Sequence, residues 1–451
     1  EDAPAAQYAR LNGLTFDFQS WKDDEELVLR EEEDGTLTVL GARQTAPHRI
    51  EIPTEICGRR VAAIAPSVTL AIDAKAKKLR AEGKNVIGFG AGEPDFPTPE
   101  YICAAAKDAI DQGMTRYTPV PGTLALREEI CKKLLRDNAL SYKPENIVVS
   151  NGAKQSLFNA LSALLNPGDE VLIPSPCWVS YPEMVRMAWG EPVYVKTREE
   201  EEFLPTAAAL EAAITPKTKA LILNSPNNPN GCVYPEKLLR DIADLAVKHG
   251  FYVISDEIYE KLIYDGQKHV SIASLGEAIR EQTIVVNGVS KSYAMTGWRI
   301  GYAAAPAKIA KAMSSFQSHS TSNANSIAQH AAAVAMTNGE AIIADMVKEF
   351  AARRDLLVRL IAETPLLKAN TPEGAFYVML NISGLLGKRY QGAEITGSND
   401  FAEMLINAKQ VAVVPGKAFG ADDHVRMSYA ISRENIAEGM RRIAEFVSEL
   451  E

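Results

Sequence analysis

Residues 219–260 read "KALILNSPNNPNGCVYPEKLLRDIADLAVKHGFYVISDEIYE", and they contain two short apolar runs on either side of an amphipathic stretch. The runs "ALILN" and "FYVIS" are rich in aliphatic and aromatic residues, which is typical of strands buried on both faces. Between them, "PEKLLRDIADLAVKHG" predicts a helix that begins at a proline and ends at a glycine. This order predicts two parallel strands joined by a crossover helix.

The same alternation continues on both sides of this unit. The run "NIVVS" precedes the predicted helix "AKQSLFNALSALL", and "EVLIPSP" precedes a helical stretch that starts near Tyr181. Further along, "FYVISD" precedes the predicted helix "EIYEKLI", and "TIVVNG" completes the series. We therefore expect an α/β fold whose large domain holds a mostly parallel sheet between helices.

The two ends of the chain have different patterns. A long helix over 339–360, the strands "AFYVMLN", "VAVVPG" and "HVRMSYA", and a terminal helix predict a smaller α+β domain. Its polar, glycine-rich loop 383–399 is either a mobile lid or a tolerated insertion. Residues 1–65 predict a β-rich extension of unknown role, with hairpins around Asp34-Gly35 and Gly58. The predicted domains are 1–65, 66–110 (an N-terminal arm and part of the small domain), 111–345 (the large domain) and 346–451 (the rest of the small domain).

Composition excludes several classes of function. The 451 residues carry a net charge of −10 without a long Lys/Arg block, which argues against a nucleic-acid partner. No apolar run approaches the ~20 residues that cross a bilayer, so no membrane span is expected. The 5 cysteines are scattered without a CxxC pair, and the 6 histidines lack metal-ligand spacing. We expect reduced thiols, a cytoplasmic location and no metal.

Polar side chains follow most of the predicted strands. Ligands of open α/β sheets bind at the carboxyl ends of the strands, so these positions are candidates for one site. An amide-rich helix start there would bind phosphate, although each position alone is also compatible with a plain turn or a core residue. Together they suit a planar anionic cofactor that a lysine holds through its aldehyde. The candidates are Asn151, Gly152, Ala153, Lys154, Cys177, Trp178, Asn227, Asn228, Asp256, Tyr259, Ser290, Lys291 and Arg299.

From about Pro66 to the end, the chain resembles the class I, fold type I, pyridoxal-phosphate aminotransferases, and within them the bacterial aspartate aminotransferase subgroup. Eight motifs carry the resemblance in the family's order. The resemblance implies pyridoxal 5'-phosphate as cofactor and a mostly parallel seven-stranded sheet in the large domain. The motifs are "GAGEPDFPTP", "TRYTPVPGTLALREEI", "SNGAKQSLFN", "PCWVSYPEMV", "NSPNNPNG", "SDEIYE", "NGVSKSYAMTGWRIGY" and "HVRMSYA".

The resemblance also implies catalytic roles. Lys291 matches the lysine that carries the cofactor as a Schiff base and moves the proton of the substrate α-carbon. Asp256 matches the acid that keeps the pyridine nitrogen protonated, which makes the ring an electron sink. Tyr259 and Asn228 match the pair that hydrogen-bonds the phenolic oxygen of the ring, and Trp178 matches the aromatic residue that stacks on it.

Binding roles are implied in the same way. Ser290, Arg299 and the amides of Gly152, Ala153 and Lys154 match the phosphate site, and Tyr117 matches a tyrosine that reaches the phosphate in the neighbouring subunit of a homodimer. Arg426 matches the arginine that grips the substrate α-carboxylate, with Gly92 contacting it through its backbone. The lysine at the position of Lys154 is the cation for a side-chain carboxylate, although a surface or capping lysine is the alternative. Trp178 and Asn228 also face the substrate.

The expected reaction is a ping-pong transfer of the amino group from L-aspartate to 2-oxoglutarate, with amino acids and 2-oxo acids as the small-molecule partners. Three alternatives stay open: aromatic or prephenate specificity, a carbon–sulfur β-lyase with the same cofactor, and a non-enzymatic regulator on the same fold. Three departures from the family pattern affect details, since Cys177 replaces an aromatic residue, Asn230 replaces a threonine and only one hydroxyl, that of Ser290, precedes Lys291.

Overall fold

The computed structural model describes residues 27–31, 37–42, 55–56, 59–60, 68–338 and 340–451. The chain separates into two compact units, Glu1–Ile64 and Ala65–Glu451. In the first unit, β1 (Leu27–Glu31) pairs antiparallel with β2 (Leu37–Ala42), and β3 (Glu55–Ile56) pairs antiparallel with β4 (Arg59–Arg60). Both strand pairs agree with the predicted hairpins, whose turn residues Asp34, Gly35 and Gly58 lie outside the described residues.

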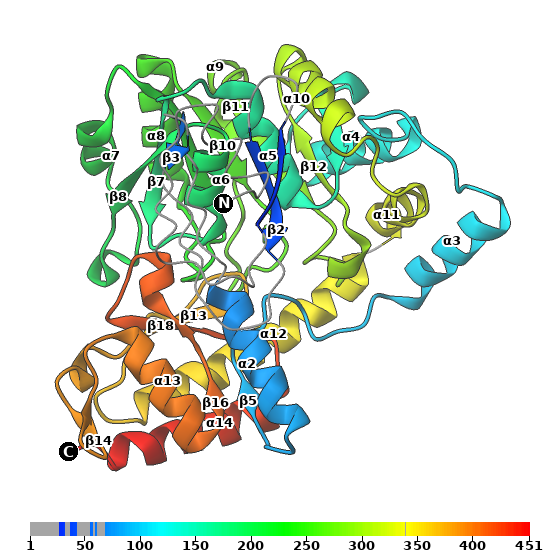
Figure 1. Cartoon of the computed structure of the whole chain (residues 1–451). Coiled ribbons are helices and arrows are strands. Elements are labelled where there is room, and N and C mark those ends of the chain that lie inside the picture. The colour runs from blue at the N-terminus through cyan, green and yellow to red at the C-terminus, as the bar shows by residue number, and fades with distance from the viewer. Residues whose placement is uncertain (1–26, 32–36, 43–54, 57–58, 61–67, 339) are drawn as a thin grey trace, which may run out of the picture. The chain divides into compact units, whose positions relative to one another are not determined.

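The second unit contains the seven-stranded sheet that was expected (Figure 1). Its strand order is β6-β12-β11-β10-β9-β7-β8. Only β12 runs antiparallel to its neighbours β11 and β6, while the other pairs are parallel, so the prediction of a mostly parallel sheet is confirmed. The strands are β6 (Ile147–Ser150), β7 (Glu170–Ser175), β8 (Glu191–Lys196), β9 (Thr218–Asn224), β10 (Tyr252–Asp256), β11 (Thr283–Gly288) and β12 (Gly301–Ala304).

Helices cover both faces of this sheet because alternate residues of each central strand point to opposite sides. Ile254 of β10 packs with α5 (Ala153–Leu164), α6 (Ser180–Met187) and α10 (Ala307–Ser320). Its neighbour Val253 packs with α7 (Ala207–Ala213) and α8 (Glu236–His249). Burial on both faces explains why these strands read as continuous apolar runs. Further helices beside the sheet are α3 (Glu100–Asp111), α4 (Leu124–Asn138), α9 (Glu277–Arg280) and α11 (Ser326–Asn338).

The segment after β10 does not form the helix that "EIYEKLI" predicts. Residues 258–261 form turns, and the chain then runs extended, so that Ile263 makes an antiparallel bridge with Gly374. The amide of Tyr264 donates to Glu373 O and the amide of Ala375 donates to Leu262 O, both at 2.9 Å. Backbone pairing with a segment about a hundred residues away therefore replaces the local helix, which propensity cannot anticipate.

A smaller layer of strands and helices lies below the large sheet in Figure 1, and the long α12 runs from beside the large sheet down into it. A three-stranded antiparallel sheet of order β13-β18-β17 and a parallel pair, β5 with β16, form its β part. The division of residues 66–451 into three segments stays a prediction. The elements are α2 (Val68–Ala81), β5 (Ile87–Gly88), α12 (Glu340–Ala362), β13 (Tyr377–Asn381), α13 (Ser398–Lys409), β16 (Val411–Ala412), β17 (Val414–Pro415), β18 (His424–Ser428) and α14 (Arg433–Ser448).

Loop 383–399 is packed against the end of the chain. Its short strands β14 (Arg389–Tyr390) and β15 (Ala393–Glu394) pair antiparallel. Leu385 and Ile395 are fully buried, and Arg389 exchanges two backbone hydrogen bonds with Glu451. These contacts favour a tolerated insertion over a mobile lid.

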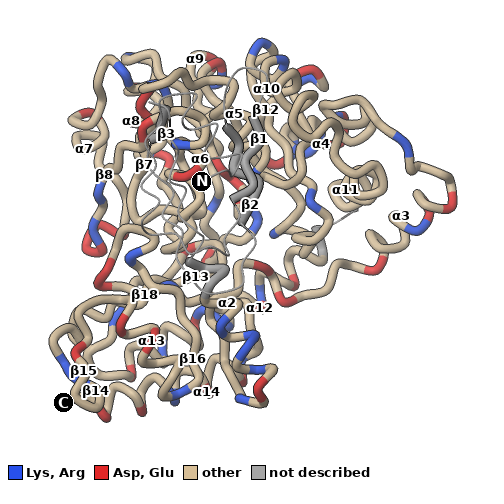
Figure 2. The backbone as a smooth tube through the Cα atoms, viewed as in Figure 1, with Lys and Arg blue, Asp and Glu red and all other residues tan. Residues whose placement is uncertain are grey.

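Among the described residues, no helix combines the length and the apolar character that a membrane span requires. Figure 2 shows Lys and Arg residues interspersed with Asp and Glu along the chain.

Candidate active site

The carboxyl ends of β9, β10 and β11 bring together most of the candidates from sequence, and β18 adds Arg426 from the smaller layer. Asp256 is the last residue of β10, Asn228 follows β9, and Lys291 follows β11. Because these strands are adjacent in the sheet, their ends meet at one edge, as the rule for open α/β sheets predicts.

Lys291 is partly buried between the large sheet and the segment after β5. Its Nζ donates to Gly92 O over 2.5 Å and lies 6.0 Å from the ring centre of Tyr259 and 5.8 Å from that of Phe376. Burial lowers the pKa of Lys291 to about 8, with Arg299 and Arg426 acting in the same direction. A larger fraction of the amine than usual is therefore in the neutral form, which is nucleophilic and basic, near neutral pH.

Asp256 is buried, and both of its carboxylate oxygens are held. The hydroxyl of Tyr181 donates to Oδ2 over 2.7 Å, and the amide of Ile258 donates to Oδ1 over 3.2 Å. Burial raises the pKa of Asp256 to about 6, although these two hydrogen bonds lower it. Sequence reasoning missed Tyr181, for which the available signal was its place three residues after Trp178 in "PCWVSYPEMV".

Tyr259 and Asn228 stand beside Asp256. The hydroxyl groups of Tyr259 and Tyr377 lie 3.1 Å apart, and burial raises the pKa of Tyr259 well above its usual value. The amide N–H of Asn228 donates to Asn224 Oδ1 over 2.8 Å, while Asn228 Oδ1 accepts from Arg426 Nη1. Tyr377 is a second site residue that sequence reasoning missed, because the strand "AFYVMLN" carries no polar motif.

Arg426 is 2% exposed and is held by neutral groups. Its Nη1 donates to Asn228 Oδ1 and its Nη2 donates to Gly90 O, both over 3.0 Å. The guanidinium lies 4.4 Å from the ring centre of Tyr377. The buried Nε has no acceptor among the described residues, so the group retains donor capacity for an external anion.

Arg299 and the start of α5 form a tight cradle. Arg299 Nη1 donates to Thr296 O over 2.8 Å and Nη2 donates to Asn151 O over 3.2 Å. Gly152 has φ of +83°, and a Cβ atom there would lie 2.4 Å from Arg299 Nη2. Its amide donates to Ser150 O, which leaves the first amides of α5, those of Ala153 and Lys154, for a ligand. Arg299 and Asn151 also line a cavity of about 880 Å³.

Trp178 and Lys154 form one wall of this region. The ring of Trp178 packs edge-on against Tyr181 with 5.3 Å between the ring centres. Lys154 Nζ lies 4.8 Å from the ring centre of Trp178. Desolvation by the surrounding protein, followed by the charge of Arg299, lowers the pKa of Lys154.

Ser290 and Tyr117 differ in where the fold places them. Ser290 is buried directly before Lys291, as the sequence places it. Tyr117 is 92% exposed and lies in the connection between α3 and α4, where it lines a second cavity of about 320 Å³ with Met114 and His330. The structure therefore does not bring Tyr117 to the other site residues within one chain.

These features fit the pyridoxal phosphate that the sequence implies. The cradle at Gly152, which even a methyl group would fill, offers free amides and a guanidinium to a phosphate. Asp256 offers a buried carboxylate for a ring nitrogen, and Lys291 offers an amine with a lowered pKa for an aldehyde. Arg426, whose Nε meets no acceptor in the described part of the chain, remains for a carboxylate.

Comparison with known proteins agrees with this geometry. The family model described as aminotransferase class I and II matches residues 84–443. An aspartate aminotransferase of Bacillus sp. (strain YM-2) is 47% identical over 396 residues, which are 87% of this chain and 99% of that protein. An aspartate/prephenate aminotransferase of Thermus thermophilus is 48% identical and covers 86% of this chain and 97% of its own length.

Solved structures show the same likeness. The aspartate aminotransferase from Rhizobium meliloti superposes with a TM-score of 0.84 at 43% identity, covering 86% of this chain and 98% of its own. That of Thermus thermophilus with maleate has a TM-score of 0.81 at 46% identity, covering 86% and 100%. The chain therefore belongs to the class I and II aminotransferase family, whose aspartate aminotransferase members are transaminases that use pyridoxal phosphate.

Proposed function

We propose that this protein transfers the amino group of L-aspartate to 2-oxoglutarate. The observation that carries the proposal is a set of three cations, Lys154, Arg299 and Arg426, that have no carboxylate partner among the described residues. Within the part of the chain that the structure describes, Arg299 and Arg426 donate to backbone and amide oxygens and to no carboxylate. Three unpaired cations match one phosphate and the two carboxylates of a dicarboxylic amino acid.

The relatives support a dicarboxylic substrate. Several are named for aspartate, and one solved neighbour carries maleate, which is a four-carbon dicarboxylate. In this assignment Arg426 binds the α-carboxylate, with Gly92 at its side, and Lys154 binds the side-chain carboxylate. Desolvation lowers the pKa of Lys154 and so disfavours its ammonium form, which the carboxylate of a bound substrate would stabilise.

Pyridoxal phosphate, when bound, supplies an aldehyde that receives the amino group and a ring that takes up electrons from the substrate α-carbon. Lys291 holds that aldehyde covalently and, as a free amine, accepts the proton of the substrate α-carbon. Its lowered pKa suits this task because a base works best when its pKa lies near the operating pH. Asp256 holds a proton at the ring nitrogen through its buried carboxylate.

The remaining residues orient the ring. Tyr259 donates its hydroxyl proton toward the phenolic oxygen, and Asn228 presents its amide Nδ2, since Oδ1 already accepts from Arg426. Trp178 covers one face of the ring. The phosphate is held by Ser290, Arg299 and the amides at the start of α5, and Gly152 provides the space.

A substrate panel tests the proposal. Wild-type protein loaded with pyridoxal phosphate is mixed with aspartate, prephenate plus glutamate, phenylalanine and cystathionine, and absorbance and products are followed. We expect conversion by aspartate with the highest kcat/KM. Lys291→Ala should lose at least about a thousandfold in rate, because both the covalent anchor and the base are removed.

The other outcomes each reject the proposal in a different way. A higher kcat/KM for prephenate would make prephenate the preferred substrate, which the name of the Thermus thermophilus aspartate/prephenate aminotransferase includes. Release of ammonia and pyruvate from cystathionine would assign a β-lyase. A Lys291→Ala variant with unchanged turnover would reject the catalytic assignment.

We also propose a homodimer. Four large apolar residues are exposed on α3, on α4 and in the connection between them, and exposed apolar surface often marks a contact with another protein. Tyr117 in this region would reach the phosphate of the second copy. Sedimentation of the wild type should give twice the chain mass. The exposed residues are Ile110, Met114, Tyr117 and Leu124.

The cytoplasmic location stays a prediction from the cysteine pattern.

A further inference from the structure

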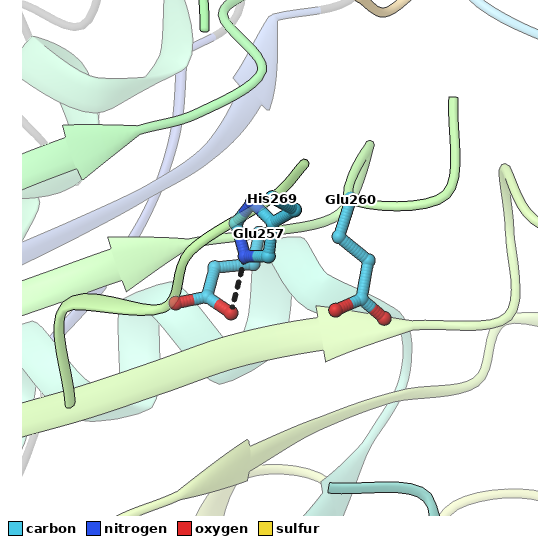
Figure 3. A group of neighbouring side chains, drawn as sticks. All are labelled: Glu257, Glu260 and His269. Atoms are coloured by element: carbon cyan, nitrogen blue, oxygen red, sulfur yellow. Dashed lines mark hydrogen bonds and ion pairs between the residues drawn. The ribbon is translucent and has the colours of Figure 1, made fainter. Parts of the chain in front are cut away.

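A second group of polar side chains lies behind the site, on the turn that follows β10. Asp256 and Tyr259 face the site, whereas Glu257 and Glu260 on the same turn point away from it. Figure 3 shows these two carboxylates with His269, which lies beside Glu257. Glu257 is 1% exposed and Glu260 is 7% exposed, so both carboxylates are buried in the protein.

The Glu257 carboxylate receives three hydrogen bonds. Its Oε1 accepts from Ser255 Oγ over 2.9 Å and from Ser271 Oγ over 2.6 Å, and its Oε2 lies 3.0 Å from His269 Nε2. Ser271 and His269 belong to the segment that leads into the short helix Ile272–Leu275. A buried carboxylate with this many donors is fixed in place, and it ties the strand end to a later part of the chain.

The fixed carboxylate continues into the site through the backbone. The amide of Glu257 donates to Val286 O over 2.8 Å, so the neighbouring strand β11 holds the peptide before it. The next amide, that of Ile258, donates to Asp256 Oδ1 over 3.2 Å. The orientation of that amide depends on where the Glu257 residue is held. A continuous path thus runs from His269 and Ser271 to one oxygen of Asp256.

The charges of the group argue against a metal ion. Glu260 forms an ion pair with Lys133 and accepts from Asn138 Nδ2 over 2.8 Å. Burial would raise the pKa of Glu260, but Lys133 and His269 lower it, so this carboxylate is ionised and paired. A divalent cation would have to displace the Lys133 ammonium, which the surroundings already use as the counter-ion.

We propose that Glu257, anchored by His269 and Ser271, is a positioning residue that aims the carboxylate of Asp256 at the cofactor ring. The inference rests on the proposed function, because Asp256 has a target only when pyridoxal phosphate is bound there. Glu257 itself does not touch the reacting atoms. Its contribution is to hold the Ile258 amide on Oδ1, while Tyr181 holds Oδ2.

The test compares Glu257→Gln, His269→Ala and His269→Gln with the wild type in the full chain. Glu257→Gln keeps the shape of the side chain but removes its charge, and His269→Gln keeps an N–H donor that His269→Ala lacks. Two properties are measured besides turnover: the Kd of the cofactor-free protein for pyridoxal phosphate, and the pH at which the absorbance of the bound cofactor changes. We expect Glu257→Gln and His269→Ala to weaken binding about tenfold and to move that pH, as the loss of one charged hydrogen bond implies. His269→Gln should restore most of both.

Asp137→Asn is the matched control. Asp137 is another shielded carboxylate, 8% exposed in its side chain, and it pairs with Lys261 over 2.9 Å. It also lies 3.9 Å from Lys133, the partner of Glu260, but it makes no hydrogen bond to Glu257, His269 or Asp256 among the described residues. It should lower the Tm as Glu257→Gln does but leave both cofactor properties unchanged. The inference would be overturned if Glu257→Gln lost as much Tm as the control but kept the Kd and the titration pH of the wild type. The proposed function would then remain intact.

A wild type that binds no pyridoxal phosphate would instead reject the proposed function. A chelator-sensitive Tm of the wild type would assign the group to a metal and overturn the inference as well.

Discussion

Arg426 Nη1 donates to Asn228 Oδ1 over 3.0 Å, and this bond joins the smaller layer to the edge of the large sheet. The same arginine reaches Gly90 O with Nη2 and keeps its buried Nε without a partner among the described residues. One residue of the proposed substrate site is thus held from two parts of the chain, and its hydrogen-bond partners among the described residues are neutral groups. Its positive charge remains available to a ligand.

Arg426→Lys should therefore weaken binding of the α-carboxylate. A lysine cannot keep the bonds to Asn228 and Gly90 while also making a forked contact, so KM for aspartate should rise by about ten- to a hundredfold. Steady-state kinetics with aspartate measure this. Arg354→Lys is the control, because Arg354 is also buried (3% exposed) but pairs with Asp265. An equal rise in KM in both variants would contradict the assignment.

Lys154→Met should reduce the preference for dicarboxylic substrates. Removal of one charged hydrogen bond costs about 1.5–3 kcal/mol, which corresponds to a loss of about ten- to a hundredfold in kcat/KM for aspartate. The kcat/KM for alanine should change little, because alanine has no second carboxylate. Lys311→Met removes an exposed lysine on α10 and serves as the control. Equal losses for aspartate and alanine would show that Lys154 acts on the cofactor and not on the substrate side chain.

Asp256 makes the stability of the cofactor-free protein depend on pH. Its folded pKa of about 6 lies above the unfolded value of 3.8, so the folded state binds more protons between these values. Its contribution to stability is present below the unfolded pKa and is lost as pH rises through about 6. The free energy of unfolding of the wild type, relative to Asp256→Asn, should fall by about 2 kcal/mol between about pH 4 and pH 7. Urea unfolding at both pH values measures it; a constant difference would show that the carboxylate is not desolvated.

The chain that begins at Ala65 should keep transaminase activity. Residues 1–64 form a separate compact unit. The aspartate aminotransferase of Geobacillus stearothermophilus matches 86% of this chain with 98% of its own length, which leaves almost no residues for an equivalent of the first unit. We expect kcat and KM for aspartate within about twofold of the full chain, because domains with their own core fold alone. A truncated chain that binds pyridoxal phosphate but has lost turnover would show that the first unit shapes the site.

Much of the site could be predicted because strand ends follow from apolar runs. The buried runs of β9, β10 and β11 fix where Asn228, Asp256 and Lys291 emerge, and adjacency in a parallel sheet brings them together. Arg426 could be identified only through the resemblance to the aminotransferase family. Its strand lies in the smaller layer, and no local pattern links it to Asn228, which is 198 residues away.

The remaining features depend on contacts that sequence patterns do not encode. The expected helix after β10 was wrong because Ile263 pairs with Gly374 and pulls the chain into an extended form. Tyr181 and Tyr377 were missed because their hydroxyls meet Asp256 and Tyr259 only after the elements pack. A sequence pattern places a buried tyrosine in the hydrophobic core, and the role of its hydroxyl group can be assigned only when its hydrogen-bond partner is known.

Gly152→Ala should weaken cofactor binding more than a comparable substitution elsewhere. Gly152 has φ of +83° and a Cβ would lie 2.4 Å from Arg299 Nη2, whereas Gly168 has φ of +85° and open space around the same position. Both alanine variants should lose about 1–3 kcal/mol of stability, because a side chain is disfavoured at positive φ. Only Gly152→Ala should also displace Arg299 and raise the Kd for pyridoxal phosphate, by about tenfold or more. Fluorescence titration of both cofactor-free variants measures this. Equal affinities would mean that Arg299 can shift without cost and that phosphate binding does not require glycine at position 152.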